Sequence, residues 1–281
     1  MERTKDYLLI MPADNKEASI GKFMEKRTKD LLIIMPAYNE EASIGKFLEN
    51  FDKPEIAEIA DVLVIDDGSI DFTNDIVQET RHTVVRHIYN MGYGAALMTG
   101  YKYAIRRKYK YVIQIDSDGQ HDPCNIISLY NKLREVDEEG KTPDIVLGSR
   151  FLEGGKSFPI SLSKKLAISG FRKLIYITTG KRITDPTTGL QGLSRRAFLY
   201  YSIYSNFDLR YPDANMLIKI MMLGYRVEEI PAIMHPRESG TSMHHGLGPA
   251  KYMAHMFFSI CAIWLRVRVL KEERRPRLWN K

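Results

Sequence analysis

The sequence predicts an α/β fold in which a mostly parallel β-sheet is flanked by helices. From residue 30 onward, short runs rich in Val and Ile alternate with longer amphipathic segments, a rhythm typical of βαβ units. A chain of 281 residues with 44% hydrophobic and 27% charged residues is long enough to bury a substantial core. The same composition excludes a chain that is mainly disordered, collagen-like or built around disulfides.

The apolar runs are the predicted strands, because Val and Ile favour extended structure. They lie at residues 31–35, 62–65, 84–88, 111–115 and 145–147. The amphipathic segments between them are predicted helices at residues 41–50, 72–80, 95–107 and 125–138. After Arg150 the pattern changes, and we expect longer helices at residues 162–179 and 215–223 and a short strand pair around residues 226–234.

Residues 3–26 are an imperfect duplicate of residues 27–50, with 18 of 24 positions identical. Two copies are too few for a repeat protein, which needs about three or more to bury its core. Since one site has room for one such strand, we interpret residues 1–26 as a duplicated, non-catalytic extension. Residues 27–248 are then the main domain, and residues 249–281 are a C-terminal tail.

Each predicted strand ends directly in a polar or glycine-rich cluster. The clusters are residues 36–40, 66–69, 90–94, 116–122 and 148–150. Because the carboxyl ends of parallel strands lie at one edge of an open sheet, where ligands bind, we expect the five clusters to converge on one site.

Asp116 and Asp118 are the strongest candidates for metal ligands. Alternate residues at the end of a strand can direct two carboxylates into one pocket, where their repulsion is costly unless a cation lies between them. Carboxylate oxygens suit Mg²⁺ or Mn²⁺, and such ions usually complete their shells with substrate phosphates. The alternative is a solvated turn that caps the helix after Pro123. The position of the two residues directly after an apolar run favours the metal site.

Two other clusters indicate contact between loop backbone and a ligand. In residues 66–69 a turn glycine lets the backbone approach a ligand, and an acid can accept from a base or a ribose hydroxyl; the alternative is an Asx turn. Residues 90–94 match half of a dinucleotide fingerprint. The full fingerprint needs a glycine at Leu97, so nicotinamide binding is not expected.

Eight motifs occur in a fixed order along the chain. They are PAYNEE, VIDDGS, NMGYGAA, DSDGQHDP, GSRF, DPTTGLQ, YPDAN and EEIPAIMHPRESGTS. With these motifs, residues 31–253 resemble glycosyltransferase family 2, and within it the branch similar to dolichyl-phosphate mannose synthase, which has the GT-A fold.

The resemblance implies an inverting glycosyltransferase that moves a hexose from a nucleotide diphosphate sugar. The positions that it implies for nucleotide binding are Pro36, Ala37, Tyr38, Glu40, Asp67 and Gly94. The positions that it implies for a metal ion, Mg²⁺ or Mn²⁺, are Asp116, Asp118 and Gln120. The metal ion would bridge these residues and the diphosphate.

The acceptor determines which further residues are needed. A hydroxyl acceptor requires a general base, for which Asp185 and Asp213 are candidates; the alternatives are a turn at Asp185 and a helix N-cap at Asp213. A phosphate acceptor is already ionised near pH 7, since its second pKa is about 6. It needs cationic groups instead, for which the candidates are Arg150, Lys165 and Arg237.

Two acceptors and one non-enzymatic role stay open at this point. Relatives that use polyprenyl phosphate commonly have an arginine where this chain has Gln191, so a sugar hydroxyl of a growing glycan is an alternative to a lipid-linked phosphate. A catalytically silent nucleotide-binding scaffold is the alternative from another class. His235 shares a glycine- and hydroxyl-rich stretch with Arg237 and is expected to be a lid or surface residue.

The C-terminal tail predicts contact with an anionic membrane surface. Fourteen residues without formal charge lie between Lys251 and Arg266, about 21 Å of helix at about 1.5 Å per residue, too short for a bilayer core of about 30 Å. A narrow polar stripe and a wide apolar face fit a helix that lies in the membrane interface. The alternative is a helix packed on the domain or on a dimer partner.

Charge and cysteine content indicate where the protein acts. Residues 264–281 hold seven basic and two acidic residues, a local net charge of +5 out of +6 for the chain. A nearly neutral body with a basic tail argues against nucleic-acid binding. The two cysteines match no metal or redox spacing, which predicts a reducing compartment. We therefore expect a cytoplasmic protein, peripheral on the inner face of the cell membrane, that builds a cell-surface glycan.

Overall fold

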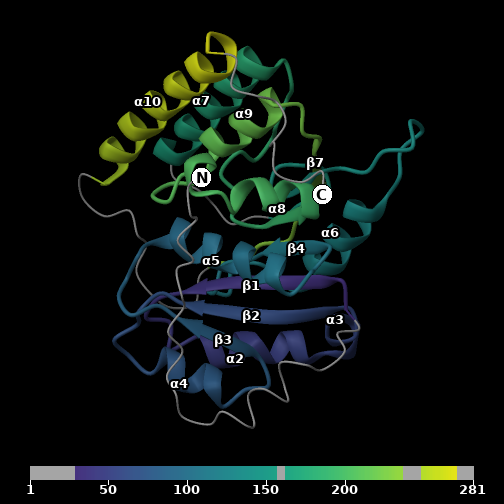
Figure 1. Cartoon of the computed structure of the whole chain (residues 1–281), viewed down its shortest axis with the longest axis vertical. Helices are drawn as coiled ribbons and strands as arrows, with labels where there is room; N and C mark the ends of the chain where they lie inside the picture. The colour runs from purple at the N-terminus through teal and green to yellow at the C-terminus, as the bar shows by residue number, and fades with distance from the viewer. Residues whose placement is uncertain (1–28, 157–161, 237–247, 271–281) are drawn as a thin grey trace, which may run out of the picture.

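The computed structural model describes residues 29–156, 162–236 and 248–270, which form a seven-stranded sheet with helices on both faces (Figure 1). The strands are β1 (Leu31–Ala37), β2 (Ala60–Asp66), β3 (Thr83–Arg86), β4 (Tyr111–Gln114), β5 (Ile145–Ser149), β6 (Gln191–Ser194) and β7 (Val227–Pro231). Their order in the sheet is β3-β2-β1-β4-β6-β5-β7. Only β6 runs antiparallel to its neighbours in this sheet, so the predicted mostly parallel sheet is confirmed.

The two faces of the sheet carry separate hydrophobic clusters. In β1, Leu31 and Ile33 join one cluster while Leu32 and Ile34 join the other, as the alternation of side chains along a strand requires. All seven residues of β1 are buried, because both faces are covered by helices and the strand is central. This double burial explains why β1 is a continuous apolar run.

The helices divide between the two faces. The first face is covered by α2 (Ile44–Glu49), α3 (Pro54–Ala57), α4 (Thr73–Gln78) and α6 (Cys124–Arg134). The second carries α5 (Tyr93–Arg106), α7 (Leu162–Thr179), α8 (Arg195–Tyr201), α9 (Ala214–Met222) and α10 (Gly248–Arg268). In Figure 1, α7, α9 and α10 form an outer layer beyond α5 and α8. Two 3₁₀ turns, Asn50–Asp52 and Tyr204–Asn206, complete the described elements.

The predicted strands and helices are confirmed at most positions, and two departures have clear causes. Strand β6 and helix α8 were not predicted. The β6 sequence Gln-Gly-Leu-Ser has one large apolar residue, which is too few for the apolar run that predicts a strand. The predicted strand pair around residues 226–234 is wrong, since β7 is one strand that pairs in parallel with β5. The predicted extension, residues 1–26, lies outside the described residues and stays a prediction.

Helix α10 packs on α9 through one face. Met256, Ile260, Ile263 and Val267 are buried there, at the spacing of an amphipathic helix. Within the described part of the chain, no helix combines the length and the apolar character needed to cross a membrane.

Candidate functional site

The loops after β1 and β2 are joined into one surface by backbone-to-side-chain hydrogen bonds. The Asn39 backbone N–H donates to Ser69 Oγ at 3.0 Å, and the Glu40 N–H donates to Thr73 Oγ1 at 2.8 Å. Asn39 itself has a φ of 55°, a conformation that asparagine tolerates better than most residues. The predicted nucleotide cluster after β1 therefore lies directly beside the cluster after β2.

The predicted nucleotide residues of the first loop differ in exposure. Pro36 and Ala37 are buried as the last residues of β1, and Glu40 is half-buried and accepts from Ser43 Oγ at 2.9 Å. Tyr38 is 43% exposed. Its ring is thus the part of this loop that is available to stack on a flat ligand.

Asp67 holds the glycine-rich loop that precedes α5. Its carboxylate accepts from the backbone N–H groups of Met91 at 2.9 Å and Gly92 at 2.7 Å, and it lies 2.6 Å from His87 Nδ1. Gly94 must be glycine, because a Cβ there would lie 2.5 Å from the carbonyl oxygen of Leu209. The structure thus brings Asp67 and Gly94 together. The Asp67 side chain binds the backbone of the glycine-rich loop and so fixes the conformation of that loop.

Asp116 and Asp118 lie directly after β4 and are both half-buried. Asp116 Oδ1 accepts from the Tyr93 hydroxyl at 2.9 Å, and Asp118 Oδ1 accepts from the Gln120 backbone N–H at 3.0 Å. The backbone of Gly189 closes one side, since a Cβ there would lie 2.3 Å from Asp116 Oδ2. The two carboxylates therefore sit in a cradle built by Tyr93, Gly189 and the turn at Gly119.

The capping alternative for these two acids is not supported. The side chain that accepts from the first N–H of α6 is Asp122, at 2.9 Å from the backbone nitrogen of Cys124. Among the described residues, no group of three His, Cys, Asp or Glu side chains could hold a metal ion by itself. Two carboxylates and the Gln120 amide are nevertheless a donor set that fits Mg²⁺ or Mn²⁺, which retain positions for water and phosphate oxygens.

The segment after β7 runs along the loop that contains Asp118. The His235 backbone N–H donates to the Gln120 carbonyl at 2.7 Å, and His235 Nε2 lies 3.0 Å from Asp122 Oδ2. Asn125 also binds both the N–H and the carbonyl of Ile233. His235 is therefore next to the predicted metal ligands, whereas Arg237 lies outside the described residues.

Two predicted site residues bind each other. Arg150 donates from Nε to Asp185 Oδ2 at 2.6 Å and from Nη2 to Asp185 Oδ1 at 2.7 Å, and Asp185 is fully buried. Glu229 of β7 accepts from the backbone N–H of Asp185 at 2.9 Å. Such a bidentate pair joins the loop after β5 to the loop before β6, and Glu229 ties the second loop to β7. Lys165, the other cationic candidate, is exposed on α7.

Asp213 is placed at the N-terminus of α9, but its side chain does not cap that helix. Its Oδ2 instead accepts from the hydroxyl of Tyr252 on α10 at 2.9 Å. Burial raises the pKa of Asp213 to about 6; the bond from Tyr252 opposes this rise, and the nearby carboxylates of Asp116 and Asp208 add to it. The Asp213 carboxyl is therefore bound to α10 instead of capping α9.

Asp208, in the same loop as Asp213, has the opposite behaviour. Burial alone would raise its pKa, but hydrogen bonds from His255 and from two backbone N–H groups hold the pKa below its usual value. Two acids whose environments move their pKa values apart are typical of a site that separates a proton acceptor from a fixed charge.

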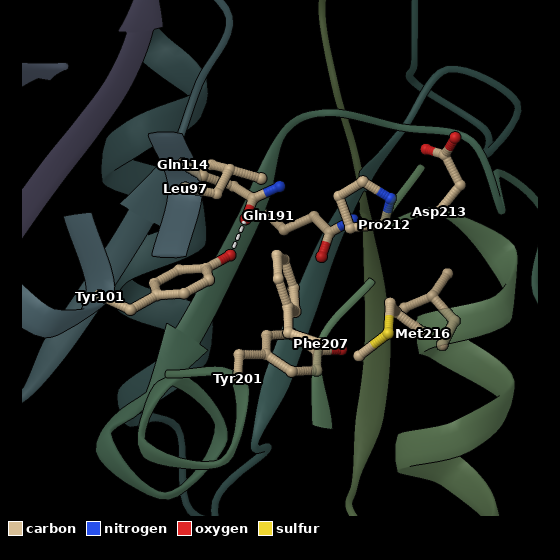
Figure 2. Close-up of a pocket in the computed structure, with 10 residues that line it drawn as sticks. Leu97, Tyr101, Gln114, Gln191, Tyr201, Phe207, Pro212, Asp213 and Met216 are labelled. Atoms are coloured by element: carbon tan, nitrogen blue, oxygen red, sulfur yellow. Dashed lines mark hydrogen bonds between the residues drawn. The ribbon is translucent and has the colours of Figure 1, made fainter. Parts of the chain in front are cut away.

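A pocket lies beneath Asp213. Figure 2 shows its carboxylate pointing away from Met216 and Phe207, which line the pocket with Tyr201. On the other side the Tyr101 hydroxyl donates to Gln114. The pocket is therefore lined by both polar and apolar side chains, with Gln114 and Gln191 beside Phe207 and Met216.

Three contact residues of this site were not among the predicted site residues, although Tyr93 and Gly189 lie within the motifs NMGYGAA and DPTTGLQ. Tyr93 and Gly189 contact Asp116, and Tyr252 contacts Asp213. In the sequence, Tyr252 is part of a largely apolar predicted helix. Only the structure, in which its hydroxyl binds Asp213, identifies it as a residue of the site.

Comparisons with known proteins agree with this geometry. Residues 32–201 match the profile of the family described as glycosyl transferase family 2. The chain is 32% identical over 170 residues to an uncharacterized protein of Methanocaldococcus jannaschii, covering 60% of this chain and 68% of that one. It is 28% identical over 193 residues to the undecaprenyl-phosphate mannosyltransferase of Micrococcus luteus, covering 66% and 76% of the two chains.

Solved structures show the same fold. Glucosyl-3-phosphoglycerate synthase of Mycobacterium tuberculosis, in complex with Mn²⁺, UDP-glucose and phosphoglyceric acid, superposes with a TM-score of 0.57 at 17% identity, over 85% of this chain and 79% of that one. The implied GT-A fold is confirmed. Since the family profile covers more than half of the sequence and includes the loops after β1, β2 and β4, the chain belongs to glycosyl transferase family 2.

Proposed function

We propose that this glycosyltransferase moves a hexose, with inversion, from a nucleotide diphosphate sugar to a polyprenyl phosphate at a membrane surface, with Mg²⁺ or Mn²⁺ as cofactor. The observation that carries the proposal is the pair Asp116 and Asp118, which lie after β4 in a cradle formed by Tyr93, Gly189 and the turn at Gly119. The named relative from Micrococcus luteus uses an undecaprenyl phosphate, which supports the acceptor.

The donor nucleotide binds across the loops after β1 and β2 in this proposal. The exposed Tyr38 ring stacks on the base, and the backbone of Pro36 and Ala37 lines the base pocket. Glu40 and the loop that Asp67 holds contact the ribose and the phosphates. A hydrogen-bonded pair of loops supplies a surface that needs little rearrangement on binding.

The cation is held by Asp116, Asp118 and Gln120. When bound, it stabilises the negative charge that grows on the leaving diphosphate. Tyr93 and Gly189 keep Asp116 at a fixed position, so the carboxylates need not reorient as the bond breaks.

Asp213 is the proton acceptor of the reaction. A phosphate monoanion has a second pKa of about 6, and Asp213 has a pKa of about 6 in the folded chain, so the proton can pass between them at little cost. Asp185 and Arg150 have a structural role instead, because the charge and hydrogen-bonding groups of each are paired with those of the other.

Transfer to a sugar hydroxyl is the second candidate function. It is favoured by Gln191, which stands where relatives that use polyprenyl phosphate have an arginine, and by the presence of a raised-pKa carboxylate suited to act as a general base. A silent scaffold is disfavoured by the intact acidic cluster.

Helix α10 provides the membrane contact. Its inner face packs on the domain, so the packed-helix alternative holds for that face. Two residues of the predicted polar stripe face the domain: His255 contacts Asp208 in the loop before α9, and Ser259 contacts Asn215 in the first turn of α9. The outer face carries exposed apolar residues and two arginines; they are Phe257, Phe258, Trp264, Leu265, Arg266, Arg268 and Val269. Exposed aromatic and aliphatic side chains beside arginines fit the interface of an anionic leaflet.

Replacing Asp118 by alanine tests the metal site. The substitution removes a ligand and relieves carboxylate repulsion, so the fold should persist while transfer from UDP-glucose or GDP-mannose, whichever the wild type consumes, falls by about 10²- to 10³-fold. Excess chelator should abolish wild-type transfer. Asp75→Asn, on the exposed side of α4, is the charge-matched control. Full activity of Asp118→Ala, or of the wild type in chelator, would contradict the metal assignment.

The pH dependence of Asp213→Asn separates the two acceptors. Because the carboxylate form accepts the proton, wild-type activity should rise as pH increases through about 6. At pH 6, Asp213→Asn should lose about 10²- to 10⁴-fold. With a phosphate acceptor the variant should recover near pH 8, where the phosphate is fully ionised, whereas a hydroxyl acceptor allows no recovery. Asp185→Asn should instead lower the free energy of unfolding by about 3 to 5 kcal/mol, because it leaves the half-buried Arg150 guanidinium without its charged partner. An active, pH-independent Asp213→Asn would exclude this acid.

Changing the outer face of α10 tests membrane binding. Phe258→Glu with Leu265→Glu should reduce co-sedimentation with anionic vesicles of phosphatidylglycerol and phosphatidylcholine, because both side chains are exposed and removal of apolar contact is combined with repulsion. Val136→Glu with Tyr204→Glu, exposed elsewhere, is the matched control. Binding should weaken at high salt as the electrostatic part is screened. Equal sedimentation of both double variants would argue against this surface.

A further inference from the structure

Helix α10 contacts the loop before α9 and the first turn of α9 through three polar side chains, as well as through its apolar face. The contacts are Tyr252 with Asp213, His255 with Asp208 and Ser259 with Asn215, each at 2.9 Å. The partners lie between the loop residue Asp208 and Asn215 in the first turn of α9. The helix that faces outward with apolar residues therefore fixes the segment that carries the proposed proton acceptor.

The position of the Tyr252 ring is fixed by two other aromatic rings. Phe171 of α7 lies 6.1 Å from it and Tyr211 lies 5.2 Å from it, both in edge-to-face geometry. Phe171 is itself 1% exposed, so this arrangement is part of the close-packed core. The Tyr252 hydroxyl is thus held at one place rather than free to follow Asp213.

The loop before α9 also packs against Gly94, on the side of the site proposed to bind the nucleotide. The carbonyl oxygen of Leu209 occupies the space in which a Gly94 side chain would lie. A loop that moved with Asp213 would therefore also disturb the turn that Asp67 holds.

We propose that Tyr252 is a positioning residue, whose hydroxyl holds the Asp213 carboxylate in the orientation that receives the acceptor's proton. The inference rests on the proposed function, in which Asp213 is the proton acceptor. It assigns Tyr252 no contact with substrate.

The groups that face Asp213 determine what loss of the hydroxyl does. They are the carboxylates of Asp116 and Asp208, the phenol of Tyr93 and the phenol of Tyr252. Burial and the two carboxylates favour the neutral acid, whereas the bond from Tyr252 favours the carboxylate. Removing the hydroxyl should therefore raise the pKa of Asp213 further.

Tyr252→Phe tests the inference, with Tyr211→Phe as the control that removes a hydroxyl from the adjacent ring. The pKa of Asp213 is measured by NMR titration of ¹³C-labelled aspartate in metal-free protein, with Asp213→Asn to assign the signal. Tyr252→Phe should titrate at higher pH than the wild type, and the acidic limb of its kcat profile should move in the same direction. At pH 7, kcat should fall by about 10- to 100-fold, with the donor KM unchanged. Tyr211→Phe should match the wild type in the Asp213 titration, in the kcat profile and in the donor KM.

Three outcomes are distinguishable. An Asp213 titration and a rate profile that are unchanged in Tyr252→Phe would overturn the inference while leaving the proposed function intact. Equal shifts in Tyr211→Phe would also overturn it, because they would show a general effect of packing. A wild-type protein that transfers no sugar would overturn the proposed function itself, whatever the titration shows.

Discussion

Repulsion among carboxylates is the constraint on which the site depends. Asp116, Asp118 and Asp213 gather at one end of the sheet, and each would be destabilised there without a compensating group. Hydroxyl donors meet two of them, Tyr93 at Asp116 and Tyr252 at Asp213. These hydroxyls are neutral, so they stabilise the negative charge of the carboxylates without neutralising it. The cluster can therefore still attract a divalent cation and accept a proton from the acceptor.

The residues that compensate this charge come from distant parts of the chain. Tyr93 begins α5, Gly189 precedes β6 and Tyr252 lies on α10. The site is therefore finished only when the outer layer of helices has packed on the sheet. In the proposed function the same α10 meets lipid with its outer face, so the surface that locates the enzyme and the contact that orients Asp213 belong to one helix.

The sequence predicted most of the sheet because its central strands are buried and rich in apolar residues, as in β1 and in the run of residues 62–65 in β2. It did not predict β6, whose four residues include one large apolar side chain and which is a strand through antiparallel pairing with β4 and β5. The motifs located Asp116 and Asp118 because both follow one strand. They could not show that Arg150 and Asp185, 35 residues apart, neutralise each other, nor that Tyr252 reaches Asp213, since both facts depend on packing between distant segments.

The central claim is that the end of the sheet is a nucleotide diphosphate site completed by a divalent cation. The most direct test is the unfolding temperature of the wild-type protein with UDP or GDP, in Mn²⁺ and in chelator. Since a ligand at 100 times its Kd stabilises the folded state by about 2.7 kcal/mol, the account predicts that one of the two nucleotides raises the unfolding temperature by about 5 to 10 °C in Mn²⁺. It predicts little change in chelator. An equal rise in chelator, or none with either nucleotide, would contradict it.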